Sequence, residues 1–204
     1  MIPTHQQTPR LYQRMLSGRR VHLLDPSPLD IDVAGDFLTA ISREPRWNGQ
    51  TVGDEAYRVA QHCVLEERVL MEMVWRKAPR AARLYVLIHD LAEALLKDLP
   101  SPLKAAIKAH GYGEVEERLD RAIRIRVGLP PTLPPEWEEN RKRAERILAV
   151  TEAVRLGCWT EKDARRDVGA GYRGKLWDGE MLAWGEARCR EEWRRKYLFL
   201  GGAL

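Results

Sequence analysis

Apolar residues recur every three to four positions along most of the chain, which is the spacing of amphipathic α-helices. The pattern predicts six main helices, at about 29–42, 54–75, 79–97, 101–127, 136–156 and 180–200. Residues 1–17 are polar without a period and are predicted to form a flexible N-terminal arm. Residues 157–179 are rich in glycine and are predicted to form a loop. The fold class is therefore predicted to be all-α.

One polar cluster interrupts an apolar stretch. His89, Asp90 and Glu93 follow the run 84–88, which reads as a core helix. On a continuous helix these three side chains share a face. Burying them without partners costs several kcal/mol, so they are expected to be paired, to bind a metal or to face a cleft.

A histidine on the preceding helix extends this cluster. His62 lies one residue before Cys63, at the border of an apolar stripe. Two adjacent helices can bring His62 to His89 and Asp90, and two imidazoles with a carboxylate suit a divalent cation such as Zn²⁺, Co²⁺ or Mn²⁺. The competing interpretation is a structural histidine held by hydrogen bonds. The spacing alone leaves both open.

The composition indicates the kind of surface, the redox compartment and whether the chain meets a membrane. The 34 basic and 30 acidic residues are interspersed and leave a net charge of +4, which favours an ordinary solvated surface over a nucleic-acid-binding face. The three cysteines lie far apart, without a CxxC pair, so a reducing cytoplasm is expected. No segment approaches the roughly 18 apolar residues of a membrane span, so no membrane association is predicted.

The chain resembles the HD-domain metal-dependent phosphohydrolases, in the branch that acts on nucleotides. Residues 89–104 read HDLAEALLKDLPSPLK and follow that branch's HDxxE…xDLP[TS]PxK pattern. Further matches are RWNGQT at 46–51, YRVAQH at 57–62 and GRRVHLLDP at 18–26. The resemblance implies a helical bundle with a single central metal site, here over residues 18–156. Residues 157–204 are then a loop and a C-terminal helix that packs on this domain or on a partner subunit.

The resemblance also implies residue roles. One divalent ion per subunit (Co²⁺, Mn²⁺, Zn²⁺ or Mg²⁺) is expected on His62, His89, Asp90 and a fourth carboxylate. The family has Asp at that fourth position, where this chain has Glu145, which is one methylene longer. The catalytic carboxylate, which orients or deprotonates water, falls on Glu93. Residues expected near the substrate are Asp98 and, at its phosphates, Arg46, Lys104 and Lys142.

Trp47 has two interpretations. It lies in a loop beside Arg46, where this branch shapes its nucleotide pocket, so it is a candidate for contact with the base or sugar. It is equally a candidate for ordinary core packing.

The function that the resemblance implies is metal-dependent hydrolysis of phosphate from (deoxy)nucleotides, either mono- or triphosphates. It resembles the activity of bacterial 5'-deoxynucleotidases and phage dATP triphosphohydrolases. The expected partners are a nucleotide substrate and further copies of the chain. Two alternatives stay open: a non-catalytic nucleotide-binding module in which Glu145 weakens the metal site, and an HD-type nuclease.

Overall fold

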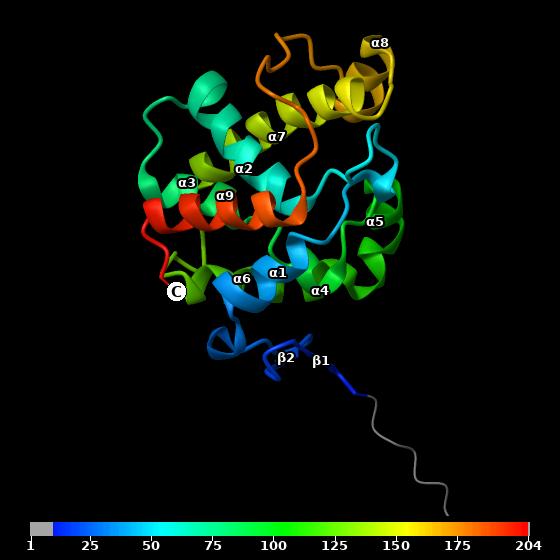
Figure 1. Ribbon diagram of the computed structural model, residues 1–204. Coiled ribbons are helices and arrows are strands. Elements are labelled where there is room, and N and C mark those ends of the chain that lie inside the picture. Colours follow the sequence, from blue (N-terminus) through cyan, green and yellow to red (C-terminus); the bar gives the residue numbers. More distant parts are fainter. Residues whose placement is uncertain (1–9, 204) are drawn as a thin grey trace, which may run out of the picture.

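The computed structural model describes residues 10–203 and is mostly helical, as the apolar pattern predicted (Figure 1). Short 3₁₀ or π segments are labelled η. The elements in chain order are β1 (Tyr12–Arg14), β2 (Arg20–His22), η1 (Pro28–Asp30), η2 (Val33–Phe37), α1 (Leu38–Ile41), η3 (Trp47–Gly49), α2 (Val59–Val69), η4 (Leu70–Val74), α3 (Arg80–Ile88), α4 (Glu93–Leu96), α5 (Ser101–Ile107), η5 (Lys108–Tyr112), α6 (Gly113–Arg126), α7 (Pro135–Arg155), α8 (Glu161–Asp163), η6 (Ala164–Val168) and α9 (Glu186–Phe199).

Helix α2 is the central element of the fold. It packs against α3, α7 and α9, which come from three separate parts of the chain. Every residue of α2 except Arg68 is buried, including Gln61, His62, Glu66 and Glu67. Polar side chains in such a position need partners, because an unpaired buried polar group is costly. Gln61 and Glu67 find theirs on α3 and on the C-terminal part of the chain, and His62 finds one on α7.

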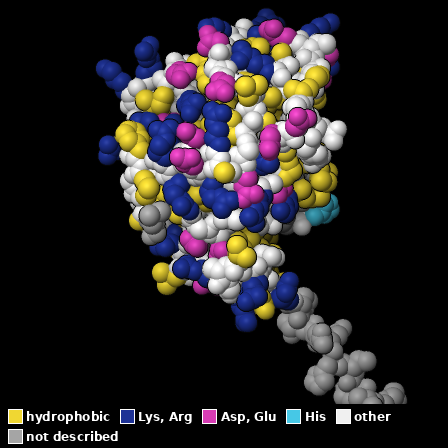
Figure 2. Space-filling model, viewed as in Figure 1, with side chains coloured by type: hydrophobic (Ala, Val, Ile, Leu, Met, Phe, Trp, Pro, Cys, Tyr) yellow, Lys and Arg dark blue, Asp and Glu magenta, His cyan; other side chains and the backbone are white. Residues whose placement is uncertain are grey.

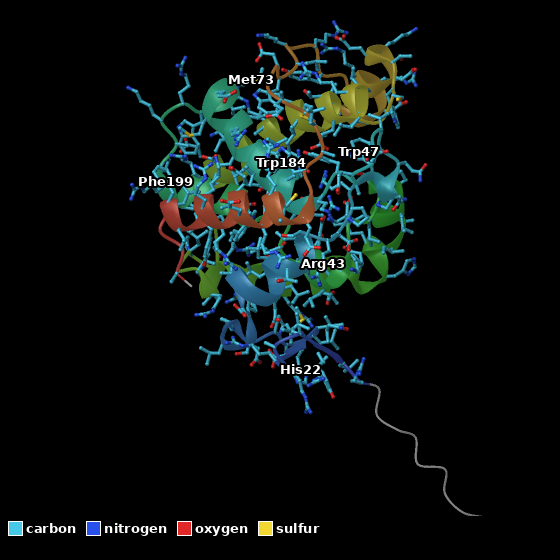
Figure 3. All side chains as sticks on the ribbon, viewed as in Figure 1. His22, Arg43, Trp47, Met73, Trp184 and Phe199 are labelled. Carbon is cyan, nitrogen blue, oxygen red and sulfur yellow. The ribbon has the colours of Figure 1, made fainter. Side chains whose placement is uncertain are left out.

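Gln61 and Glu67 fasten the C-terminal region to α2. The Gln61 amide donates to the Leu182 carbonyl at 2.8 Å and accepts from the Trp184 N–H at 2.8 Å. Glu67 accepts from Arg83 at 2.6 Å and pairs with Lys196 of α9. Trp184 lies beside α2 (Figure 3). Residues 182–200 therefore pack on the same chain's central helix.

The predicted arm is wrong for residues 12–14. Tyr12–Arg14 forms β1, which pairs antiparallel with β2 and places Tyr12 opposite His22. The turn uses Gly18 at φ +92°, a conformation that glycine adopts without steric cost. Ser17 joins this hairpin to the domain, because its N–H and hydroxyl both donate to the Asp36 carboxylate, at 3.0 and 2.5 Å. The boundary between 17 and 18 thus falls inside a hairpin, and residues 1–9 lie outside the described residues.

Several predicted helix ends are also wrong. The second helix begins at Val59 rather than after Asp54, and its N-cap residue is Arg58, which makes no capping side-chain bond. The first begins only after Asp32, whose carboxylate accepts from the N–H groups of residues 35 and 36. The last begins at Glu186, and the predicted loop contains α8 and η6. The helix predicted over 101–127 is broken by η5, in which Gly111 has φ +92°.

The most consequential difference is the end of α3 at Ile88, where a helix to about residue 97 was predicted. The backbone N–H groups of Leu91, Glu93, Ala94 and Leu95 bond three residues back, for example Glu93 N–H to the Asp90 carbonyl at 3.1 Å. This is the tighter 3₁₀ pattern, in which residues three apart lie on one face. Asp90 and Glu93 therefore share a face of this turn.

The outer surface mixes charges. On the face seen in Figure 2, Lys and Arg side chains are intermixed with Asp, Glu and apolar side chains. Many of them pair locally, as Arg195 does with Glu192 at 2.6 Å and Lys175 with Asp178 at 2.7 Å. Within residues 10–203, no helix has both the length and the apolar content that crossing a bilayer demands.

Candidate metal centre

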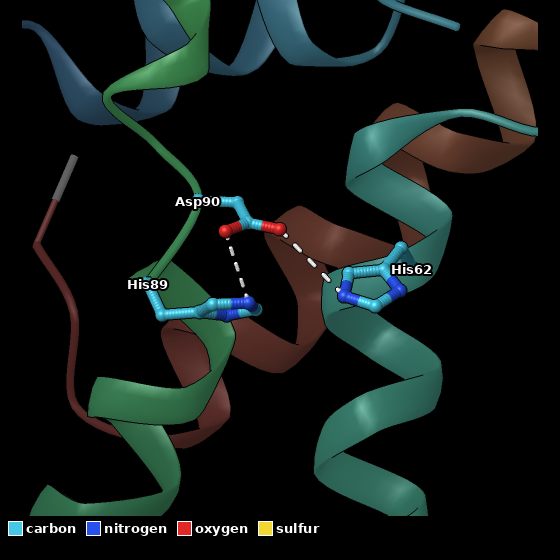
Figure 4. A group of neighbouring side chains, drawn as sticks. All are labelled: His62, His89 and Asp90. Carbon is cyan, nitrogen blue, oxygen red and sulfur yellow. Dashed lines mark ion pairs between the residues drawn. The ribbon is translucent and has the colours of Figure 1, made fainter. Parts of the chain in front are cut away.

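The structure brings three of the predicted ligands together. His62 comes from the middle of α2, His89 caps the C-terminus of α3, and Asp90 follows it (Figure 4). The Asp90 carboxylate lies between the rings, with Oδ1 3.1 Å from His89 Nε2 and Oδ2 3.6 Å from His62 Nε2. One ligand atom from each residue falls within 4.8 Å of the others, so this cluster could hold a metal ion.

Both histidines are oriented through their other ring nitrogen. Nδ1 of His62 lies 2.6 Å from Glu152 Oε1, and Nδ1 of His89 lies 2.7 Å from the Val86 carbonyl oxygen. An ionised carboxylate and a carbonyl only accept hydrogen bonds, so each Nδ1 carries a proton and donates. In a neutral ring the lone pair is then on Nε2, the atom that faces Asp90. Histidine metal ligands are typically held in this way.

Buried polar atoms converge on the same point. Glu66 Oε2 lies 3.1 Å from His62 Nε2 and 3.2 Å from His89 Nε2. These separations are short, yet the angles are not those of hydrogen bonds. Within the described part of the chain, both Nε2 atoms and both Glu66 oxygens lack a hydrogen-bond partner. Such atoms are costly to bury unless something binds them, so the residues present fit a divalent cation.

The electrostatics of the metal-free cluster favour protonated imidazoles. Burial and Arg46 both disfavour the charged form of His62, but the carboxylates of Glu152 and Glu66 outweigh them and raise its pKa to about 10. For His89, burial is likewise outweighed by Asp90 and Glu66, and its pKa lies well above the usual value. A metal would therefore compete with two protons for the Nε2 atoms.

Glu93 begins α4 next to this cluster and is buried. Its pKa is raised well above the ordinary value by burial and by the nearby carboxylates of Asp90 and Asp98, against the opposing charges of Arg46 and Lys104. Its Oε2 has no hydrogen-bond partner within residues 10–203. A carboxyl group with a raised pKa and a free oxygen is suited to proton transfer.

Arg46 reaches the cluster from a loop in an unusual backbone conformation. Trp47, Asn48 and Gly49 all have φ between 52° and 70°, which is rare for residues other than glycine and frequent at functional sites. This turn places the Arg46 guanidinium 3.2 Å from Asp90 Oδ2 and 3.9 Å from Asp98 Oδ1. Asp98 also accepts from the Trp47 backbone N–H at 3.2 Å. Arg46 and Asp98, both predicted near the substrate, therefore lie beside the candidate ligands.

Glu152 is a residue that the sequence analysis did not single out. It is fully buried and accepts from Tyr57 Oη at 2.7 Å, from His62 Nδ1 at 2.6 Å and from the Trp47 indole N–H at 3.0 Å. Burial alone would raise its pKa, but His62 and Arg46 lower it to about 2. One ionised carboxylate thus fixes a ligand ring and the loop that carries Arg46.

The Trp47 side chain packs against two neighbours. Its indole is half-buried, is anchored on Glu152 and meets the Trp159 ring edge-on, with ring centroids 6.3 Å apart. These contacts support the packing interpretation, and a contact of Trp47 with a base or sugar stays a prediction.

The other predicted residues lie outside the group of three ligands. Glu145 is nevertheless near it: burial would raise its pKa, but Arg141, His89 and His62 outweigh burial and lower it. Lys104 pairs with Glu116, and Lys142 is exposed and lies 3.2 Å from Glu138. Glu145 accepts from Arg141 at 2.9 Å and does not belong to the group of three ligands. Its role as a ligand stays a prediction. His5 lies outside the described residues.

The fold and this cluster define a mostly helical protein with a candidate centre of two histidines and an aspartate. No protein-family model matches the chain. It is 42% identical over 163 residues to an uncharacterized protein of Rhodobacter capsulatus, a match that covers 78% of this chain and 80% of that protein. It is 32% identical over 144 residues to the uncharacterized protein YfdR of Escherichia coli, covering 71% of each. The chain belongs to the family of these proteins.

Proposed function

We propose that this protein is an HD-domain phosphohydrolase that uses a divalent metal ion to remove phosphate from (deoxy)nucleotides. The observation that carries the proposal is the convergence of His62 Nε2, His89 Nε2 and the Asp90 carboxylate at one buried point. Glu93 lies beside them with a raised pKa, as a proton-transfer group should. The HDxxE…DLPSPxK segment supports the same assignment.

Each residue then has a chemical role. His62, His89 and Asp90 would hold the metal, which supplies Lewis-acid polarisation of a phosphoryl oxygen and a lowered pKa for bound water. Glu93 takes the proton of the attacking water. Arg46 offers a buried positive charge beside Asp90, where it can neutralise charge that develops on the phosphoryl group.

Two further residues position this machinery. Glu152 holds the His62 ring through Nδ1. Asp98 holds the Arg46–Trp47 turn through the Trp47 N–H. Both contacts fix the orientation of a reacting group before substrate arrives, which is where much of the rate of phosphoryl transfer comes from.

One observation favours a second candidate, the non-catalytic nucleotide-binding module. Glu145, the expected fourth ligand, is engaged by Arg141 at 2.9 Å. If no other group replaces it, the metal would be held by three protein ligands only and bound weakly.

A nucleotide panel separates the two. We expect the full-length protein, supplied in turn with Mn²⁺, Co²⁺, Zn²⁺ and Mg²⁺, to release phosphate, pyrophosphate or triphosphate from at least one class of (deoxy)nucleoside mono- or triphosphate. Chelator-treated protein is the control and should be inactive. Nucleotide binding without release under every metal would support the non-catalytic module instead.

A further inference from the structure

Glu66 has the surroundings of a metal ligand. It follows His62 by one helical turn on α2, so both side chains project from the same face. Its side chain is fully buried, and one oxygen, Oε2, lies 3.1 and 3.2 Å from the Nε2 atoms of His62 and His89. Within residues 10–203, neither of its oxygens has a hydrogen-bond partner. In the metal-free protein Glu66 is therefore held by ion pairs with the two imidazoles, and not by a hydrogen bond or by solvent.

The distances from Glu66 to the two histidines match those between neighbouring ligands on one ion. Glu66 lies outside the group of three whose ligand atoms are all within 4.8 Å of one another, so its carboxylate has to rotate toward Asp90 to share an ion with it. Bonds of about 2.0–2.1 Å place two ligand atoms about 2.9 Å apart at a right angle and about 3.4 Å apart at the tetrahedral angle. The two separations from Glu66 Oε2 fall in this interval, and so does the 3.1 Å between His89 Nε2 and Asp90 Oδ1. Only the 3.6 Å between His62 Nε2 and Asp90 Oδ2 is slightly longer.

An ion pair with Arg141 does not account for Glu66. The nearest guanidinium nitrogen is 3.8 Å from Glu66 Oε1. The hydrogen bonds of Arg141 go elsewhere: to both oxygens of Glu138 at 2.9 and 3.0 Å, and to Glu145 at 2.9 Å. Arg141 therefore occupies the carboxylate of Glu145 and leaves that of Glu66 free to face the histidines.

We propose that Glu66, and not Glu145, is the fourth protein ligand of the divalent cation, and that Glu145 acts through Arg141. The inference rests on the metal site of the proposed function and assigns its missing ligand. The resulting set of two imidazoles and two carboxylates suits Zn²⁺, Co²⁺, Mn²⁺ or Fe²⁺, because mixed nitrogen and oxygen donors serve these ions well. With Glu66 as the fourth ligand, the site does not need the carboxylate at position 145, where this chain has Glu in place of the family's shorter Asp.

The test is Co²⁺ binding by the full-length protein, followed by its visible absorption spectrum and by calorimetric titration. Glu66→Gln should lower the affinity at least about 100-fold, beyond the roughly 10- to 100-fold range for residues that act through a ligand, and should change the spectrum. Glu145→Gln, a matched change on α7, should lower the affinity less than about 10-fold and leave the spectrum unchanged.

A second pair of variants, with Asp in place of Glu, keeps the test valid if Glu66→Gln misfolds. If Glu66→Gln does not fold, Glu66→Asp keeps the charge but retracts the oxygen by one methylene, so the spectrum should still change, whereas Glu145→Asp should leave it as in the wild type. The assignment of Glu66 would be overturned, and the metal site kept, if Glu145→Gln lost Co²⁺ binding while Glu66→Gln bound Co²⁺ as the wild type does. Wild-type protein that takes up no Co²⁺ would contradict both the proposed function and the assignment.

Discussion

Replacing Glu93 with Gln should lower the turnover of nucleotide hydrolysis by about 10²- to 10⁴-fold, the range for loss of a general acid or base. The amide has nearly the same shape but cannot take a proton from water. Glu93 lies beside the ligand group but is not part of it. Metal content, measured by elemental analysis of the purified variant, should therefore stay at the wild-type level.

Asp90→Asn is the contrasting variant for this prediction. Asp90 lies within 3.6 Å of both Nε2 atoms, so its loss should remove metal and turnover together. Turnover of Glu93→Gln within a factor of about ten of the wild type would show that another group handles the proton.

Replacing Glu152 with Gln should destabilise the fold and weaken the site at once. The Glu152 carboxylate accepts from three donors, those of Tyr57, His62 and Trp47. A glutamine amide turns one of its two acceptors into a donor and removes a buried negative charge near Arg46. Loss of one partner from such a buried charged group costs about 3–5 kcal/mol. Urea unfolding should show a fall of that order.

The same variant should lose metal affinity by about 10- to 100-fold, because a histidine ligand loses the group that orients it. Asp178→Asn is the surface control, since Asp178 is exposed and pairs only with Lys175 in a local contact. It should leave both the unfolding transition and metal binding unchanged. An unfolding free energy of Glu152→Gln equal to that of the wild type would mean that Glu152 is not the anchor that its contacts indicate.

The long helices were predictable, whereas the break at His89 was not. Helix α7 was predicted within one residue at each end, because its apolar stripe is long and a run of prolines marks its start. The sequence after Ile88 contains good helix formers such as Leu, Ala and Glu, so local propensity favours a continued helix. The 3₁₀ turn at 89–92 arises from packing, which overrides that preference.

The central histidines and Asp90 were predictable from residue type and spacing, but Glu66 and Glu152 were overlooked. Glu66 lies on the same helical face as Val59, Cys63 and Leu70, three residues after Cys63 and four before Leu70, so the helical period already placed this carboxylate on the buried side. In the structure α3, α7 and α9 surround α2, so its polar face is buried too. The usable signal was the spacing His62-x-x-x-Glu66, one helical turn, and for Glu152 its place two turns after Glu145.

The claim that this cluster is a catalytic metal centre is tested most directly by titrating metal-free protein with a divalent ion while following phosphate release from an active nucleotide. The account predicts that the rate rises to a plateau at one equivalent of metal per chain, and that Asp90→Asn shows no such rise. A rate independent of added metal, with Asp90→Asn as active as the wild type, would contradict it.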